Sequence, residues 1–320
     1  MLVAKDGSGD YKTIQEAIDQ VPEDSSQRTV IRIKAGVYQE KLVIEKKKVT
    51  LIGDGDQTII TYGDNAKKLD ENGQPYGTFN SYTALIAGDD FIAENIVFEN
   101  SAGPGSEVGQ ALAVYIDADR VAFKNCRFLG HQDTIFTAPL PPKPMSGNYF
   151  NSPREFAERK VGRHYFEDCY IEGDVDFIFG SATAIFYKCK IHSKNRTGYI
   201  TAASTPEGTK YGYVFIDCKL TGDAPANSVY LGRPWRDYAK TVFINTYMGE
   251  HIRTEGWHNW NKENAEKNAF YAEYNSYGPG AALDQRVKWA KLLTAAEAEE
   301  YTIENVFQGW IPFKEMEGIN

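Results

Sequence analysis

The chain has 320 residues, of which 42% are hydrophobic and 25% charged, and its formal net charge is −9. This composition is typical of a globular protein with a sizeable core, and the 20 Tyr and 17 Phe favour β-strands. The negative charge argues against a nucleic-acid partner, and no run of 18 apolar residues exists that could span a membrane.

The first predicted element is a short helix near the N-terminus. Thr13 and Glu16 have the spacing of a capping box that opens a helix. Such a helix could cover strand edges that an open first layer of a β-protein would otherwise expose. The chain begins at Met1 without a signal peptide, so the protein is either cytoplasmic or has lost an export signal.

Six segments farther along the chain repeat one pattern of alternating apolar and polar residues, rich in Phe, Tyr, Ile and Val, which is typical of strands. They are residues 91–100, 121–130, 164–173, 184–193, 213–222 and 241–250. Their equivalent positions are Ile96, Cys126, Cys169, Cys189, Cys218 and Thr246, separated by 30, 43, 20, 29 and 28 residues.

The repeat predicts an all-β solenoid, because short strands in coils of about 20–30 residues can stack on their neighbours. A β-sandwich is the alternative, but it does not require Cys at one register four times. We expect a single domain over residues 1–320, since no linker is visible. Long excursions at 64–80 and 137–160 should wall a cleft, and a second capping box at Thr294 predicts a C-terminal helical segment.

The cysteine register has two interpretations. Stacked strands lie about 4.8 Å apart, which is within the range of Cα separations that a disulfide bridges. Cys169 and Cys189 are therefore a plausible pair. A stack of reduced cysteines packed as small hydrophobes fits the spacing equally well.

Two aspartates share the cysteine spacing. Asp133 follows Cys126 by seven residues, and Asp176 follows Cys169 by seven. If the cysteines stack, the aspartates stack too, unless a bulge intervenes. Adjacent carboxylates repel and split their pKa values, an arrangement that catalytic sites use to keep one as acid and one as anion. Either aspartate alone would more often be a solvated turn residue.

Polar residues of other types could complete such a site. Gln132 adjoins Asp133, and Gln110 precedes an apolar strand; a neutral amide suits an oxyanion hole because it donates without protonating a carboxylate. Arg233 and Trp235 are two residues apart and would share one face in a strand; Arg pairs with carboxylates, and Trp stacks on sugar rings. Gln110 could otherwise lie at the surface, and the Arg–Trp pair could be a surface cation–π contact.

Motifs along nearly the whole chain resemble pectin methylesterases, a family of carbohydrate esterases. They include Asp6-Gly-Ser-Gly-Asp-Tyr11, Gly36-Val-Tyr-Gln-Glu40, Thr78-Phe-Asn-Ser81, Gln110-Ala-Leu-Ala113, Gln132-Asp-Thr134, Asp176-Phe-Ile-Phe-Gly180, Leu231-Gly-Arg-Pro-Trp235 and Gly256-Trp257. Departures at Leu112 and Tyr82, and the long loops, put the subsite preference in question.

The resemblance implies a right-handed parallel β-helix without metal or cofactor. By motif, Asp176 is the expected nucleophile and Asp133 the acid/base, with Gln110 and Gln132 as oxyanion donors and Arg233 orienting Asp176. The residues expected to contact substrate are Gln110, Tyr115, Val175, Phe179, Arg233, Trp235 and Thr78. A disulfide between Cys169 and Cys189 matches bacterial members and favours a secreted or periplasmic protein.

The expected reaction is hydrolysis of the C6 methyl esters of galacturonate in pectin, by a monomer whose partner is methyl-esterified homogalacturonan. A pectin lyase or polygalacturonase-like enzyme is an alternative, although a lyase would want clustered acidic calcium ligands and only Asp174 lies near Asp176. A non-catalytic carbohydrate-binding β-helix and an esterase with another acyl substrate are the other possibilities.

Overall fold

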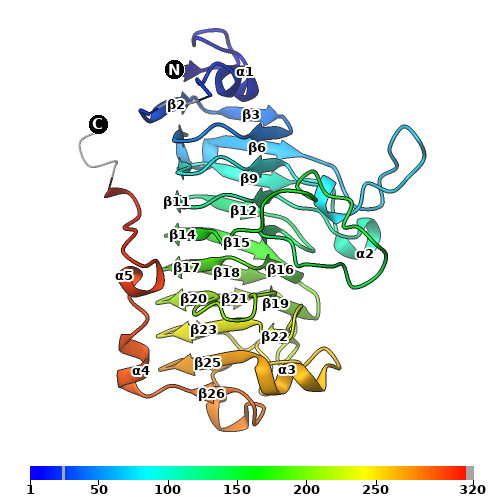
Figure 1. The fold of residues 1–320 in the computed structure, drawn as a ribbon, viewed down its shortest axis with the longest axis vertical. Helices are drawn as coiled ribbons and strands as arrows, with labels where there is room; N and C mark the ends of the chain where they lie inside the picture. Colours follow the sequence, from blue (N-terminus) through cyan, green and yellow to red (C-terminus); the bar gives the residue numbers. More distant parts are fainter. Residues whose placement is uncertain (24–25, 315–320) are drawn as a thin grey trace.

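The computed structural model describes residues 1–23 and 26–314, which wind through three parallel sheets in turn (Figure 1). All pairings between the named strands of this part of the chain are parallel, and a strand pairs with the strand one coil earlier and one coil later. This arrangement confirms the predicted parallel β-helix. No helix in the described residues is long and apolar enough to cross a membrane.

The coils in the middle of the stack contribute a strand to each of three sheets, here named A, B and C. Sheet A contains β1 (Leu2–Val3), β2 (Thr29–Ile33), β5 (Val49–Ile52), β8 (Ile92–Glu94), β11 (Val121–Lys124), β14 (Arg163–Glu167), β17 (Thr183–Tyr187), β20 (Tyr213–Ile216), β23 (Lys240–Ile244), β25 (Phe270–Tyr274) and β26 (Lys291–Leu292). Sheet B contains β3 (Gly36–Gln39), β6 (Thr58–Tyr62), β9 (Val97–Asn100), β12 (Arg127–Leu129), β15 (Tyr170–Gly173), β18 (Lys190–Ser193), β21 (Lys219–Gly222) and β24 (Tyr247–Met248). Sheet C contains β4 (Leu42–Ile44), β7 (Ala84–Ile86), β10 (Val114–Ile116), β13 (Ile135–Thr137), β16 (Val175–Gly180), β19 (Gly198–Ala203) and β22 (Val229–Gly232).

Each of the six repeated segments forms two strands rather than one. A strand of sheet A ends, one residue adopts a left-handed backbone with φ between 49° and 58°, and a strand of sheet B follows directly after the Cys, Ile or Thr position. The left-handed residues are Asn95, Asn125, Asp168, Lys188, Asp217 and Asn245. Asn and Asp tolerate this conformation better than most residues, so the polar residue before each repeat position produces the bend between sheets.

A ladder of phenylalanine rings fills the interior along sheet A. Phe123, Phe166, Phe186, Phe215 and Phe243 stack with ring centroids 5.0, 4.7, 4.4 and 4.5 Å apart. The rings are fully buried, and each aromatic pair adds about 0.5–1.5 kcal/mol beyond its area burial. Because the same residue type recurs at one register, the ladder holds the coils in that register.

The four cysteines lie at one register, at the bend between sheets A and B, but the predicted bridge between Cys169 and Cys189 is wrong. All four cysteines are buried with free thiols. The Cys169 thiol donates to the carbonyl of Glu167 at 3.3 Å, and the Cys189 thiol donates to the carbonyl of Phe166 at 3.4 Å. These bonds let the thiols pack as small core residues, so export rests on the family resemblance alone and stays a prediction.

The two predicted helical ends are present. The helix α1 (Ile14–Asp19) opens with the predicted capping box of Thr13 and Glu16 and buries Ile14 and Ile18 against the first coil. Thr294 and Glu297 cap α4 (Ala295–Glu299), and α5 (Ile303–Val306) follows. The C-terminal segment runs back along the stack, where its apolar side chains cover the outer face of sheet A (Figure 1).

Two long loops project beside sheet C, as predicted for 64–80 and 137–160 (Figure 1). They contact each other, because the Asn80 amide donates to the carbonyl of Asn151 at 2.7 Å and the Asn151 amide donates to the carbonyl of Tyr76 at 3.2 Å. The first loop ends in the 3₁₀ turn η2 (Thr78–Asn80). The remaining short helices are η1 (Gly55–Gln57), α2 (Gly105–Val108), α3 (Glu263–Asn268) and η3 (Leu283–Gln285).

Candidate active site

Asp133 and Asp176 lie side by side on the outer face of sheet C, as their common spacing predicted. Strands β13 and β16 pair with Ile135 opposite Ile178, which puts the two aspartates at one register, and the Asp133 amide donates to the carbonyl of Val175 at 3.0 Å. Both aspartates are only 7% exposed. Two neighbouring coils therefore bring two buried carboxyl groups together.

The backbone at both aspartates is left-handed, with φ of 66° at Asp133 and 50° at Asp176. A β-bulge accompanies this geometry. Val175 pairs with Tyr199 and Ile178 pairs with Thr201 on the next coil, so β16 has one extra residue between these two pairs. The irregularity lies between β16 and β19 and not between β13 and β16. The aspartates keep their mutual register for that reason. Such bulges re-aim side chains beside active sites.

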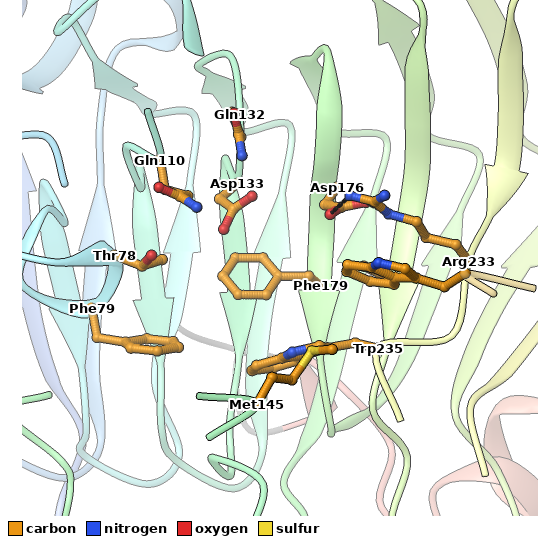
Figure 2. A pocket seen from close by; sticks show the side chains of 12 residues that line it. Thr78, Phe79, Gln110, Gln132, Asp133, Met145, Asp176, Phe179, Arg233 and Trp235 are labelled. Carbon is orange, nitrogen blue, oxygen red and sulfur yellow. Dashed lines mark hydrogen bonds and ion pairs between the residues drawn. The ribbon is translucent and has the colours of Figure 1, made fainter. Parts of the chain in front are cut away.

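Arg233 distinguishes the two carboxyl groups. Its Nε donates to Oδ1 of Asp176 at 2.8 Å and its Nη2 donates to Oδ2 at 2.6 Å, a bidentate pair drawn in Figure 2. Burial raises the pKa of Asp176, and the guanidinium opposes that rise. The pKa of Asp133 lies well above its ordinary value because of burial and then the neighbouring Asp176 charge. Of the two carboxyl groups, Asp176 therefore has the environment that favours the ionised form, and Asp133 the environment that favours the protonated form.

Two aromatic rings hold the Arg233 guanidinium between them. Its central carbon lies 3.9 Å from the ring centroid of Tyr199 and 3.7 Å from that of Trp260. Rings on both faces restrict the guanidinium plane, and cation–π attraction strengthens where water is excluded. Tyr199 and Trp260 therefore fix the direction from which Arg233 approaches Asp176.

The amides of Gln110 and Gln132 lie next to Asp133 and point towards the space in front of it (Figure 2). Gly105 of α2 packs directly on Gln132, since a Cβ at that glycine would lie 2.5 Å from the Gln132 Cβ. Only glycine permits this approach without displacing the glutamine. The predicted pair of amide donors is thereby brought to the side of Asp133 away from Arg233.

A cleft of about 260 Å³ runs over this group. It is lined by Thr78, Phe79, Gln110, Gln132, Asp133, Met145, Asp176, Phe179, Ala202, Arg233, Trp235 and Trp260. Thr78, Phe179 and Trp235 were predicted to contact substrate and do line the cleft, with the Phe179 and Trp235 ring centroids 5.7 Å apart. Aromatic rings beside polar groups suit a sugar ring.

Two predicted substrate contacts lie elsewhere. The Tyr115 side chain is 0% exposed and its hydroxyl pairs with Ser152 at 2.9 Å. The loop over residues 137–160 covers it, so the prediction that Tyr115 lines a subsite is wrong. Val175 is partly exposed beside Asp176 but does not line the cleft, and its role stays a prediction.

The cleft also contains residues that the sequence did not indicate, namely Phe79, Met145, Ala202 and Trp260, while Tyr199 packs behind it on Arg233. Phe79 is part of a quoted motif, which was a usable signal. Met145 and Trp260 lie in segments without repeats. No pattern in a single sequence marks residues of that kind.

Asp174, the acidic neighbour considered for a calcium site, faces away from Asp176 towards other partners. Its Oδ2 lies 3.5 Å from Arg196 and 3.6 Å from His131. No group of three or more potential metal ligands occurs among the residues that the structure describes. The clustered acidic ligands that a calcium-dependent lyase would use are not found in that part of the chain.

Comparisons with known proteins give a consistent result. The sequence model described as Pectinesterase matches residues 1–140 and 158–310. "Pectinesterase 31" of Arabidopsis thaliana is 41% identical over 93% of this chain and 89% of its own length. The structure of a pectin methylesterase from carrot is 34% identical over 96% of this chain and 92% of its own, with a TM-score of 0.81. A pectin methylesterase solved in complex with a hexasaccharide is 33% identical over 97% of each chain, with a TM-score of 0.80.

Proposed function

Because the chain belongs to the pectinesterase family, we propose that it hydrolyses the methyl esters of pectin through an acyl-enzyme on Asp176. The pectin substrate is supported by the relatives, which are named for that activity. The covalent route is supported by the site itself. The observation that carries it is the unequal environment of two adjacent carboxyl groups, one paired with Arg233 and one not.

Acylation begins with ionised Asp176, whose charge Arg233 stabilises against the effect of burial on its pKa. A carboxylate oxygen attacks C6 of the galacturonate ester, and the carbonyl electrons move onto the oxygen. Gln110 and Gln132 donate to that oxyanion through neutral amides. The bond from C6 to the methoxy oxygen then breaks, and the departing oxygen takes the proton of Asp133, so methanol leaves.

Deacylation reverses the role of Asp133, which is now a carboxylate. It takes a proton from water as the water oxygen attacks C6 of the anhydride. The bond from C6 to Asp176 breaks, which returns the Asp176 carboxylate, the protonated Asp133 and a free galacturonic acid group. The product acid ionises at neutral pH, so each turnover releases one methanol and one proton.

Binding relies on the aromatic side of the cleft. The rings of Trp235 and Phe179 offer stacking surfaces for the sugar that carries the ester, and Thr78 adds a hydroxyl near Gln110 (Figure 2). The net charge of −9 opposes an acidic polysaccharide. Uncharged methyl-esterified units weaken that opposition, which fits a methylated substrate better than pectate.

The direct test measures methanol from highly methylated pectin. Asp176→Asn should abolish release and Asp133→Asn should lower it about 10²–10⁴-fold, the usual contribution of acid–base catalysis. Asp223→Asn is the matched control, because its side chain, just after β21, is 73% exposed, and it should leave the rate unchanged. A hydroxamate formed on galacturonate when hydroxylamine is added, with methanol release unchanged, would support the acyl-enzyme.

Other outcomes separate the alternatives. Chain shortening without methanol would indicate a glycosidase, and absorbance at 235 nm an eliminating lyase. Turnover of Asp176→Asn at the wild-type rate would remove the acyl-enzyme from the mechanism. Export from the cytoplasm, a monomeric state and membership of the bacterial subgroup remain part of the proposal; a culture fractionation and a sedimentation measurement test the first two.

A further inference from the structure

The main-chain carbonyl of Trp235 accepts hydrogen bonds from two cationic side chains. Lys262 Nζ donates to it at 2.9 Å and also to the carbonyl of Pro234 at 2.8 Å. Arg236 Nη1 donates to the Trp235 carbonyl at 2.8 Å. Charge-assisted bonds of this kind are roughly twice as strong as neutral ones, so the short segment from Arg233 to Trp235 is held at its C-terminal end.

Each cation ties that segment to a different wall of the cleft. Lys262 follows Trp260 by two residues, and its ammonium lies 4.9 Å from the Trp260 ring centroid, the same ring that packs on Arg233. Arg236 reaches in the other direction, where its Nη2 donates to the carbonyl of Lys143 at 2.6 Å. Residue 143 belongs to the loop that brings Met145 to the cleft.

Neither cation is neutralised by an ion pair. Within residues 1–23 and 26–314, no carboxylate lies at salt-bridge distance from Lys262 or Arg236, although both are partly buried. Burial and then the neighbouring Arg236 lower the pKa of Lys262 to about 8. An unpaired, partly buried ammonium costs stability, and such costs concentrate at functional sites.

We propose that Lys262 is a positioning residue that, together with Arg236, sets the Trp235 ring for the pectin chain. The proposal rests on the proposed function, since it concerns the same cleft. Lys262 and Arg236 do not line that cleft, so both act through the backbone of Trp235. Asp176 keeps its own bonds to Arg233 when Lys262 changes, and the effect should therefore fall on substrate binding more than on the chemical step.

The main experiment compares Lys262→Met with Lys262→Arg in steady-state methanol release from methylated pectin. Met keeps the apolar stem but removes the donors, and we expect KM to rise about tenfold with kcat changed less than about twofold. Arg keeps a charged donor and should restore most of the wild-type KM. Lys267→Met, at an exposed position of α3, is the matched control and should have the wild-type KM.

A second readout uses pH and does not depend on the folding of Lys262→Met. The charged groups that act on Lys262 are Arg236, Arg233 and Asp237. As the pH passes 8, wild-type Lys262 loses a proton and its donors weaken, whereas Arg at position 262 stays charged. KM for short methylated oligogalacturonates, corrected for a blank without enzyme, should rise above pH 8 in wild type and stay level in Lys262→Arg.

The two proposals fail in different ways. Wild-type protein that releases no methanol would overturn the proposed function. Wild-type methanol release with equal KM in Lys262→Met, or with the same dependence of KM on pH in wild type and Lys262→Arg, would overturn the positioning role alone. A lower kcat with unchanged KM in Lys262→Met would also overturn the positioning role.

Discussion

Arg233→Met removes the bidentate partner of Asp176 while keeping much of the side-chain volume. The two bonds measure 2.8 and 2.6 Å, and the side chains of Arg233 and Asp176 are only 17% and 10% exposed. Water therefore cannot replace the guanidinium well. An adjacent Arg lowers the pKa of an Asp by about 1–3 units, so the pKa of Asp176 should rise by about that amount in the variant.

In the proposed mechanism activity requires ionised Asp176, so the acid limb of kcat should move to higher pH by about the same 1–3 units. Below the new pKa each unit costs about tenfold in rate. The assay is methanol release from short methylated galacturonates between pH 4 and pH 8. Reading kcat rather than kcat/KM separates this effect from any lost contact between Arg233 and substrate.

Two controls sharpen the interpretation. Arg233→Lys keeps a positive charge without the fork and should shift the acid limb less than Arg233→Met. Arg127→Met removes an arginine on sheet B whose partner, Asp56, is 71% exposed, and its profile should match wild type. An acid limb in Arg233→Met that coincides with the wild-type limb would refute the assignment of Asp176 as the ionised group.

Three further predictions concern stability and packing. The pKa of Asp133 is raised in the folded protein, so the contribution of Asp133 to wild-type stability falls as the pH rises from the unfolded pKa, near 4, to the folded pKa. Asp133→Asn lacks this titration, so the thermal midpoint of the variant should exceed that of wild type by more at pH 7 than at pH 3.5. An equal difference at both pH values would contradict this prediction. Gly105→Ala should displace Gln132 and lower kcat at least tenfold, because an oxyanion donor is lost. The midpoint of unfolding should change little. A wild-type kcat in this variant would argue against the contact between Gly105 and Gln132. Phe215→Ala breaks the ring ladder and should cost about 3–5 kcal/mol in denaturant unfolding, whereas a loss below 1 kcal/mol would show that the coils close the gap.

The repeat in the sequence was sufficient to predict an all-β solenoid and the pairing of Asp133 with Asp176, and the family resemblance specified a parallel β-helix. In a solenoid each coil contacts only the coils before and after it, so the contacts that build the fold are recorded as a period along the chain. The spacing of 43 residues between Cys126 and Cys169 reappears between the aspartates because no bulge separates β13 from β16. The capping boxes at Thr13 and Thr294 involve residues three apart and were equally visible.

The tertiary structure decided the features that depend on distant or aperiodic segments. The stack of cysteines allowed a bridge or free thiols, and local packing of each thiol on a carbonyl selected the second. The loop over residues 137–160 closed over Tyr115, which the family resemblance had placed among the substrate contacts. A loop without periodicity does not disclose which strand it will cover.

The surroundings of Arg233 show the same limit. Its motif indicated a partner for Asp176, but the rings on its two faces come from Tyr199, in the preceding coil, and Trp260, beyond the last repeat. Lys262, which holds the adjacent carbonyls, lies in the same aperiodic segment. The sequence by itself determined the coil, the register and the pair of carboxyl groups. The folded chain determined which of the two carboxyl groups pairs with a guanidinium. That pairing depends on Arg233 and on the rings that orient it, which come from segments that no regular spacing relates.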